Sequence, residues 1–314
     1  MPSQPGSSQP FSAFAETQSP DPHVSVRVST PPKPQPSARP VITRRRLLKS
    51  LFACGVLGAL PLGAGWASSR KFDITHHDLA LPGLPASLQG LTLLQLTDIH
   101  SGVYISPDDI ADMLQAAASQ KPDLVVLTGD YVTRNPNCIH PLAEQLKDLH
   151  APLGVYAVPG NHDNAAGRQV VLDALKGADV QLLINTSATI EEGFHLLGVD
   201  DAWTAHADIA GALRGVSPKA ARIMLTHNPA LLDQVTVPIT LLAGHTHGGQ
   251  VYLGKQITGA IVPDVTCGGR FFSGWYKNGR ASMYISRGVG LVGLPLRLFC
   301  PPEITVFRLV APAV

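Results

Sequence analysis

Cysteine is scarce in this sequence, and the spacing of the few cysteines excludes a disulfide framework. Four cysteines occur among 314 residues, and three of them, Cys138, Cys267 and Cys300, follow the N-terminal targeting segment described below. An odd number of cysteines with no Cys-x-x-Cys pair argues against a fold held by disulfides and against a thiolate zinc site. We therefore expect these three side chains to be buried free thiols.

The sequence also lacks an excess of either charge. It carries 24 lysines and arginines against 23 aspartates and glutamates, so its formal net charge is +1. A protein that binds nucleic acid through phosphates needs a basic surface, which this balance does not supply. We expect no nucleic-acid partner.

An apolar run long enough for a good permanent membrane span is missing too. A transmembrane helix takes about 20 apolar residues, whereas the run at residues 51–66 is shorter and is interrupted by glycines and by Pro61. Before it, residues 1–43 are rich in Pro, Ser and Gln and contain few apolar clusters. We expect this tail to be disordered, because it cannot bury enough apolar surface to offset its ordering entropy.

Residues 44–69 have the features of an export signal. The basic stretch Arg44-Arg45-Arg46 is followed by the apolar run and by small residues near Ala64, which is the order found in secretory signals. Residues 43–49 resemble the twin-arginine signal, in which Ser or Thr precedes the arginine pair and Leu-Lys follows it. The resemblance implies transport by the twin-arginine export machinery to the periplasm or cell envelope. Residues 47–66 would then be either cleaved or kept as a membrane anchor.

Residues 70–314 alternate between strand and helix signals, which predicts one α/β catalytic domain. Ser106 is a good N-cap, Pro107 suits the first helical position, and the apolar residues that follow recur at helical spacing. The alternation and the β-rich C-terminal third predict one or two packed sheets. The expected strands cover residues 91–96, 124–127, 155–158, 180–184, 194–199, 223–225, 239–242, 282–286 and 304–309, and the expected helices cover residues 107–117, 139–150, 167–177 and 205–214.

Side chains with nitrogen or oxygen ligands follow five of these strands. Open α/β sheets bind ligands at the carboxyl ends of their strands, so we expect these side chains to meet at one edge. Residues two apart on an extended chain point the same way, so Asp98 and His100, and likewise His245 and His247, should face one cleft. The candidate ligands are Asp98, His100, Asp130, Asn161, His227, His245 and His247.

The number and type of these side chains favour two metal ions. A single catalytic zinc uses three or four protein ligands, whereas seven candidates suit two ions that share a bridging carboxylate. Carboxylate, imidazole and amide together suit divalent ions such as Mn, Fe or Zn. Two ions about 4 Å apart can hold the attacking and leaving oxygens of a phosphoryl displacement.

The series Asp-x-His, Gly-Asp, Gly-Asn-His-Asp, His and Gly-His-Thr-His resembles the calcineurin-like metallophosphoesterases over residues 90–250, and more loosely to about residue 310. Residues 96–102, 244–250 and 286–290 resemble the twin-arginine-exported bacterial branch of that family, the YkuE- and YaeI-like phosphoesterases. The resemblance implies a four-layer α/β/β/α sandwich, in which two packed mixed β-sheets are flanked by helices.

The same resemblance implies a role for each matching residue. The ligands would be Asp98, His100 and His247 for one ion, Asn161, His227 and His245 for the other, and Asp130 as the bridge. His162 would not be a ligand but would face the phosphate and assist the leaving group, while Asp163 would orient nearby groups. A hydroxide bridging the ions would attack a phosphomonoester or phosphodiester.

The sequence departs from one branch of that family. After Gly129-Asp130 it reads Tyr131-Val132-Thr133, without the second Asp and the Arg-Gly of the protein Ser/Thr phosphatases. We therefore do not expect a phosphoprotein substrate. Arg287, in a Ser-Arg-Gly segment, is either a phosphate contact or an ordinary arginine at the surface or the rim of the core.

Two other functions stay open. One is a pyrophosphatase acting on a lipid-linked nucleotide such as UDP-2,3-diacylglucosamine, as some relatives in the family do. It would need an apolar cleft, which Phe271, Phe272, Trp275 and Tyr276 could line. The other is a non-catalytic envelope protein that keeps a metal site. His162 argues against it, since a structural site has no need of this residue.

Overall fold

Residues 71–203 and 207–312 are described by the computed structural model of the chain. The expected tail at 1–43 and the expected export segment at 44–69 lie outside these residues. Among the described helices, none combines the length and the apolar character that crossing a membrane requires.

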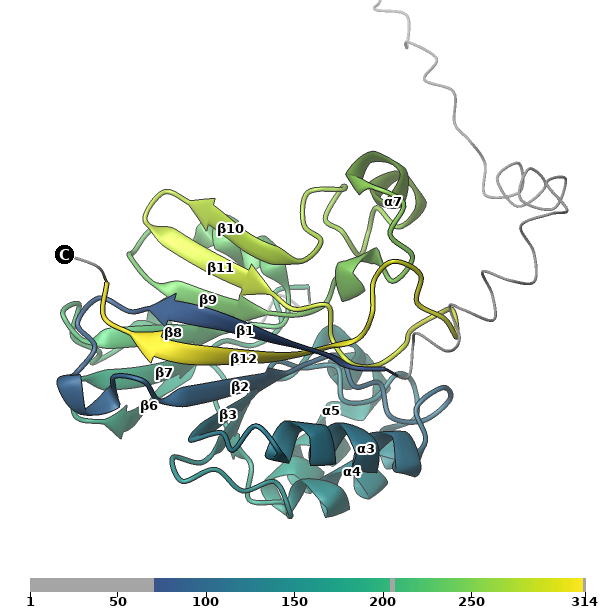
Figure 1. Cartoon of the computed structure of the whole chain (residues 1–314), viewed down its shortest axis with the longest axis horizontal. Helices are drawn as coiled ribbons and strands as arrows, with labels where there is room; N and C mark the ends of the chain where they lie inside the picture. Colours follow the sequence, from purple (N-terminus) through teal and green to yellow (C-terminus); the bar gives the residue numbers. More distant parts are fainter. Residues whose placement is uncertain (1–70, 204–206, 313–314) are drawn as a thin grey trace, which may run out of the picture. The chain divides into compact units, whose positions relative to one another are not determined.

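The strands of the described chain form two six-stranded mixed sheets (Figure 1). The first contains β1 (Asp73–Ala80), β2 (Thr92–Leu96), β3 (Leu124–Leu127), β4 (Val155–Ala157), β5 (Gln181–Leu182) and β12 (Glu303–Val310). The second contains β6 (Thr186–Glu191), β7 (Phe194–Gly198), β8 (Ala221–Leu225), β9 (Thr240–Ala243), β10 (Gly274–Asn278) and β11 (Ala281–Ile285).

The strand order puts parallel strands at the centre of each sheet. The first sheet has the order β1-β12-β2-β3-β4-β5, in which β2 to β5 are parallel and β12 is antiparallel to β2. The second has the order β10-β11-β9-β8-β7-β6, in which β7, β8, β9 and β11 are parallel. The carboxyl ends of neighbouring parallel strands therefore meet at one edge of each sheet.

Helices cover the outer face of the first sheet, with α3, α4 and α5 side by side in Figure 1. The helices are α3 (Pro107–Ala118), α4 (Ile139–Leu146), α5 (Asn161–Lys176), α6 (Ile209–Leu213) and α7 (Lys255–Ile261), with short 3-10 helices at Ala86–Leu88, Pro136–Cys138, Pro229–Gln234 and His247–Gly249. The expected cap of α3 is confirmed, because Ser106 Oγ accepts from Asp109 N while the Asp109 carboxylate accepts from Ser106 N. Helix α5 starts earlier than residue 167, since Gly167 only kinks it with a φ of 152°.

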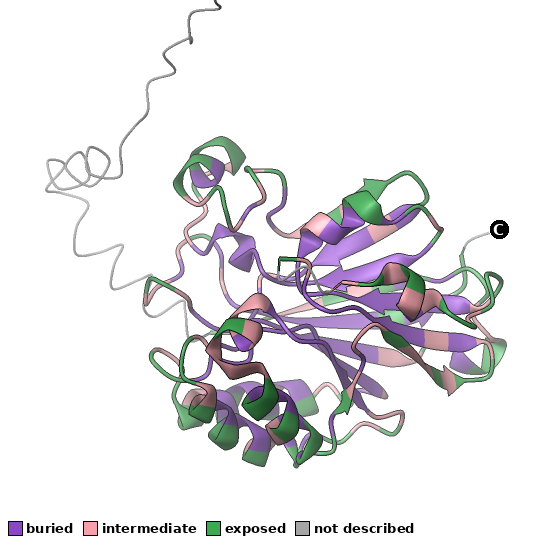
Figure 2. Cartoon of the chain, turned by 180° about the vertical axis from the view of Figure 1, so that it is seen from behind, coloured by how far each residue is buried: buried purple, intermediate pink, exposed green. Residues whose placement is uncertain are grey.

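The core lies in three layers. Leu93 and Val126 of the first sheet pack between the sheets against Ile223 and Leu242 of the second. The alternate residues of the same strands face the other way, as with Leu94, which packs in the cluster under the helices. Figure 2 shows the strands mostly buried and the outward faces of the helices exposed. The expected fold class, two packed mixed sheets flanked by helices, is confirmed.

The outer face of the second sheet has a different cover. Its buried side chains, Leu197, Met224 and Leu241 among them, pack against Leu231 of the 3-10 helix and against Phe271. Of the expected helix at 205–214, residues 205 and 206 lie outside the described residues, and the described part forms the five-residue helix α6.

Three strands and one helix were missed by the sequence prediction. The strands β1, β6 and β10 each lie at the edge of a sheet, where one side of the strand has no neighbour to bury it. Their side chains are therefore mostly half-buried or exposed, and their apolar signal is weak. The missed helix is α7, which has only seven residues.

All three described cysteines are free thiols, as expected. Only Cys300 is fully buried, whereas Cys138 and Cys267 are half-buried.

Candidate metal centre

The seven candidate ligands meet where the carboxyl ends of β2, β3, β4, β8 and β9 lie close together. Each residue follows its strand directly, so the local sequence places it at the sheet edge. The side chains form three sets, and within each set the ligand atoms lie within 4.8 Å of one another. The sets are Asp98, His100 and His247; His100, Asp130 and His162; and Asp130, His227 and His245. Six of the seven candidates are buried, and Asn161 is half-buried.

The first set gathers around two imidazoles. The Nε2 atoms of His100 and His247 are 3.1 Å apart, and Nε2 of His247 is 3.3 Å from Oδ1 of Asp98. Asp130 lies between this set and the next, with its Oδ2 atom 3.6 Å from Nε2 of His100.

The set of Asp130, His227 and His245 lies on the other side of Asp130. The Oδ2 atom of Asp130 is also 3.1 Å from Nε2 of His227. Nδ1 of His245 is 3.2 Å from the same His227 nitrogen and 3.0 Å from Oδ1 of Asn161. Asp130 is therefore the carboxylate that both sets can reach.

The backbone at these residues is not extended, which corrects one part of the sequence prediction. Five candidate ligands have left-handed φ angles: Asp98 at 55°, His100 at 51°, Asp130 at 57°, His245 at 73° and His247 at 50°. Residues with a side chain rarely adopt this conformation, and where they do it is often at functional sites. Asp98 and His100 do face one cleft, as do His245 and His247, but tight turns rather than extended strands aim them there.

Two glycines let these turns pack closely. A Cβ atom on Gly160 would overlap Oδ1 of Asp130, and one on Gly244 would overlap Oδ2 of Asp98. Each glycine therefore lets the backbone of one loop lie against the carboxylate of another.

The hydrogen-bond pattern of His227 tests whether a cation fits. Nδ1 of His227 is 2.8 Å from the carbonyl oxygen of Thr128, which can only accept, so Nδ1 carries a proton. In neutral His227 the lone pair of Nε2 then faces the Asp130 carboxylate. Two acceptors at this distance need a proton or a cation between them, so the donor set fits bound divalent ions.

Burial keeps three imidazoles neutral. It lowers the pKa of His100 to about 3 and that of His245 to about 3, and it takes the pKa of His247 well below its usual value. Neutral imidazole is the form that binds metals.

The two carboxylates of the centre have pKa values shifted in opposite directions. Burial raises the pKa of Asp98 to about 6. Burial would do the same to Asp130, but the adjacent His227, followed by His100, holds the pKa of Asp130 well below its ordinary value. Conversely, Asp130 outweighs burial at His227 and raises the pKa of that imidazole to about 10.

His162 and Asp163 lie beside the ligands at the start of α5. The backbone N–H of His162 donates to Oδ1 of Asp130 at 2.9 Å, and its Nδ1 is 3.0 Å from the carbonyl oxygen of Thr133. Since that carbonyl can only accept, Nε2 is the nitrogen of neutral His162 that is free to take up a proton. The carboxylate of Asp163 accepts from the N–H groups of Asp130, Tyr131 and Gly160, and so orients the loops that carry the ligands.

Sequence reasoning missed Arg297. Its side chain is fully buried, and its guanidinium donates to the carbonyl oxygens of Arg287, Gly288 and Gly290 and lies 3.3 Å from Nδ1 of His247. A lone arginine within the apolar stretch at 294–299 was a usable signal, because a buried guanidinium needs several acceptors.

Thr133 and Trp203 were also missed. Oγ1 of Thr133 is 3.1 Å from Nδ1 of His100. The Trp203 ring lies edge-on to His245, with ring centroids 4.4 Å apart and an interplanar angle of 83°. No periodicity or motif marks either residue, since both contacts join distant parts of the chain.

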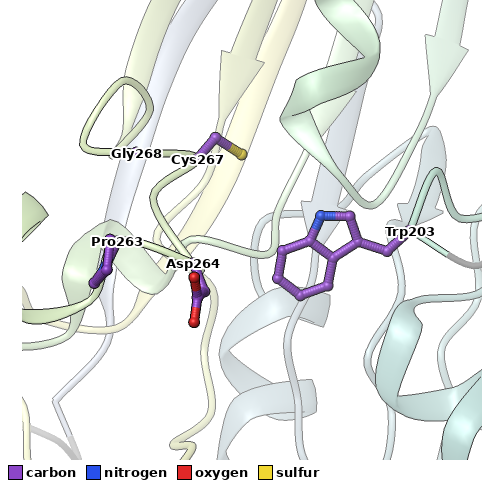
Figure 3. Close-up of a pocket in the computed structure, with 5 residues that line it drawn as sticks. All are labelled: Trp203, Pro263, Asp264, Cys267 and Gly268. Carbon is purple, nitrogen blue, oxygen red and sulfur yellow. The ribbon is translucent and has the colours of Figure 1, made fainter. Parts of the chain in front are cut away.

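A cavity of about 510 Å³ lies against Trp203, the residue whose ring contacts His245 (Figure 3). Trp203 forms one side and residues 263–268 form the other, with Asp264 and Cys267 facing the indole ring. The Trp203 backbone N–H donates to Asp201 at 2.9 Å, and the neighbouring Asp200 pairs with Arg168 of α5 at 2.7 Å. The loop that carries Trp203 is therefore fixed to the same helix as His162.

The structure also bears on two expectations from the sequence, the role of Arg287 and the apolar cleft of aromatic residues. Arg287 pairs with Glu303 at 3.1 Å and with Asp73 at 2.7 Å, so its guanidinium is engaged by carboxylates, and we assign it a structural role at the rim of the core. Phe271 and Phe272 are buried, and the backbone N–H of Phe272 donates to the Tyr276 hydroxyl. Phe271 and Phe272 therefore pack in the fold, whereas Trp275 is exposed on β10.

Comparison with known proteins adds a family match. A model of the family described as calcineurin-like phosphoesterase matches residues 91–249. The metallophosphoesterase YkuE of Bacillus subtilis is 31% identical over 282 residues, covering 85% of this chain and 98% of that protein. The phosphodiesterase YaeI of Escherichia coli is 31% identical over 286 residues, covering 86% of this chain and 100% of that protein. Among solved structures, the sulfate thiohydrolase SoxB of Thermus thermophilus matches with a TM-score of 0.45 and 11% identity, over 72% of this chain and 57% of that one.

Proposed function

This chain belongs to the calcineurin-like phosphoesterase family and is a phosphoester hydrolase, and on that premise we propose that it uses two divalent cations to hydrolyse small phosphomonoesters or phosphodiesters. The observation that carries the proposal is the position of Asp130. Its carboxylate lies within 3.6 Å of His100 and within 3.1 Å of His227, so one side chain joins two ligand sets.

We assign the residues as follows. Asp98, His100 and His247 would hold one ion, Asn161, His227 and His245 would hold the other, and Asp130 would contribute to both. Mn, Fe and Zn all suit this donor set. When bound, two such ions supply Lewis acidity that lowers the pKa of an attacking water and offsets charge on the phosphoryl oxygens.

His162 supplies the proton that the reaction needs. As water attacks phosphorus, the P–O bond to the leaving group breaks, and the leaving oxygen takes up a proton. The contact with Thr133 keeps Nδ1 of His162 in place, so protonated Nε2 is the donor. The Nδ1–H of the same ring holds its orientation through the cycle.

The substrate is a small ester rather than a phosphoprotein. The cavity against Trp203 can hold one organic group of such an ester between the indole ring and the 263–268 segment. Because Phe271 and Phe272 are buried, no observation favours the lipid-linked pyrophosphatase over a simpler ester.

We also propose that the protein works outside the cytoplasm. The support is the arginine pair at Arg44 and Arg45 and the apolar run that follows it. Replacing both arginines by Lys should retain the protein inside the cell, whereas Arg39→Lys, outside the motif, should not. Export that continues in the double variant would contradict the twin-arginine assignment.

The enzyme test separates metal binding from proton transfer. The protein reconstituted with Mn²⁺ is assayed with bis-p-nitrophenyl phosphate and with p-nitrophenyl phosphate. Asp130→Asn should lose bound metal and turnover together. His162→Ala should keep the metal and lose turnover by about 10²-fold or more.

Matched substitutions control for nonspecific effects. His140→Ala and Asp148→Asn change the same residue types at exposed positions, and both should keep metal and turnover. If the protein binds two metal ions per chain but cleaves neither ester, the proposed activity is wrong. If His162→Ala loses metal, His162 is a ligand rather than the proton donor.

A further inference from the structure

Exposed apolar side chains gather on three segments beside the candidate metal centre. Of the nine large apolar side chains that are exposed in the described part of the chain, six lie on residues 101–105, 250–262 and 289–300. We call these three segments the apolar rim. Its exposed side chains are Val103, Leu253, Ile257, Ile261, Leu294 and Phe299, of which Val103 is 78% exposed and Phe299 75% exposed.

Hydrogen bonds join the three segments into one surface. The Gln250 side chain donates to the Leu294 carbonyl at 2.8 Å and accepts from the Val292 N–H at 2.9 Å. The Tyr252 N–H donates to the Leu298 carbonyl at 2.9 Å. The Tyr104 hydroxyl lies 3.4 Å from the Gly293 carbonyl oxygen. In Figure 1, α7 and the loop before β12 lie at the same end of the sheets.

The rim is fixed to the metal centre. Residues 101–105 follow His100 directly, and residues 250–262 begin three residues after His247. The third segment is held by Arg297, whose buried guanidinium donates to the His247 carbonyl at 3.4 Å and lies 3.3 Å from Nδ1 of His247. Contacts with residues of the candidate metal centre therefore fix the positions of the segments that carry these exposed apolar side chains.

The charge of the rim is one-sided. Its three segments contain no Asp or Glu, and their charged residues are Lys255 and Arg297. Since Arg297 is buried, Lys255 is the charged side chain that the rim exposes. An apolar surface with a basic residue and no acidic one is suited to the interface of an anionic bilayer.

The position of the apolar run at residues 51–66 in the sequence also favours a bilayer as the partner of the rim. Asp73, at the start of β1, donates its N–H to the Pro302 carbonyl at 2.8 Å, and Pro302 is three residues from Phe299. Asp73 is seven positions after Trp66 in the sequence, and seven residue steps span at most about 25 Å. If residues 51–66 are kept as a membrane anchor, the covalent link therefore keeps the rim within about 25 Å of that anchor along the chain.

We propose that the apolar rim docks on an anionic phospholipid bilayer, with Phe299, Leu294 and Ile257 entering the headgroup region. This contact is independent of the proposed chemistry and is tested without any turnover. It would hold the mouth of the metal centre against the membrane surface.

Hydrogen exchange of the full chain on vesicles tests the proposal. The vesicles contain phosphatidylethanolamine and phosphatidylglycerol. Backbone amides of residues 253–262 and 291–300 should exchange at least about threefold more slowly on vesicles than in solution. Amides around Val170, an exposed apolar residue of α5, should exchange at the same rate in both.

Variants assign the protection to the side chains. L294S combined with F299S should remove the protection of residues 291–300, and I257S that of α7, while V170S should leave both. Urea unfolding checks that each variant folds. If the double variant L294S/F299S does not fold, the loss of protection is tested with I257S alone. Protection is measured only on the vesicle-bound fraction of each variant, so it is read independently of total binding.

Three results would overturn the proposal. The first is a vesicle-bound chain whose rim exchanges as fast as in solution. The second is rim protection that depends on protein concentration without vesicles, which would make a second copy the partner. The third is a rim already protected in solution and exposed by deleting residues 51–66, which would make that segment its cover.

Discussion

The carboxylate of Asp163 accepts a hydrogen bond from the backbone N–H of Asp130, with 2.8 Å between the two atoms. The same carboxylate accepts from Tyr131 and Val132 on that loop and from Gly160 on the next. The buried side chain of Asp163, which is not a candidate metal ligand, thus fixes the two loops that carry Asp130 and Asn161.

Asp163→Asn should weaken both the fold and the metal site. An amide can replace only one of the two accepting oxygens, so buried N–H groups lose their partner. We expect the free energy of unfolding to fall by about 1–3 kcal/mol and metal affinity to fall by about 10- to 100-fold. Urea unfolding and metal titration measure the two effects. An unchanged metal affinity would show that Asp163 supports the fold alone.

Gly160→Ala should disrupt the same region for a steric reason. The added Cβ would overlap the Asp130 carboxylate and backbone, so one of the two loops must move. Metal content after purification should fall several-fold. Gly177→Ala is the matched control, because a Cβ there meets only carbonyl oxygens at 3.4 Å. Equal metal content in the two variants would contradict the role given to Gly160.

Trp203→Ala should weaken substrate binding more than turnover. If the cavity holds one organic group of the ester, loss of the indole face should raise KM for bis-p-nitrophenyl phosphate about two- to tenfold, as expected for one aromatic contact. Trp203→Phe should restore much of the affinity. Trp275→Ala, which alters an exposed tryptophan of β10, should leave KM unchanged. A fall in kcat with constant KM would instead point to disturbance of His245.

Glu303 should make the protein lose stability in acid. Burial alone would raise its pKa, but Arg287 and hydrogen bonds from Thr75 and Tyr284 hold the pKa of Glu303 below its usual value. A carboxyl group with a lowered pKa in the folded state stabilises the protein above its unfolded pKa, about 4.3. That stabilisation is lost as the pH falls through the folded pKa.

The matched variant for this effect is Glu303→Gln. It should be less stable than the parent at pH about 7, and the difference should shrink as the pH falls below about 4. Urea unfolding across this range measures it. A difference that stays constant with pH would show that the charge of Glu303 does not contribute.

The meeting of the candidate ligands could be predicted because each of them lies close to the end of a strand. A buried strand followed by Asp, Asn or His is visible in the sequence, and parallel strands bring such ends together. The conformation of the ligands could not be predicted, since the left-handed backbone at Asp98 and His245 is imposed by packing against other loops. Packing of that kind depends on residues more than 100 positions apart.

Contacts between distant segments explain the other omissions. Arg297 reaches His247 across 50 residues, and Trp203 contacts His245, which lies 42 positions further along the chain. The edge strand β1 was missed because it contributes Leu79 as its one buried side chain. In these cases the local sequence carries too little information, and the tertiary fold decides.

The position of β12 in the first sheet has a consequence for when the protein can fold. This strand is the last in the chain, yet it lies between β1 and β2 and pairs with both. Until residues 303–310 are in place, β1 has no neighbour in this sheet and one edge of β2 is open. The first sheet therefore closes only when β12 pairs with both strands, however early β1 and β2 leave the ribosome.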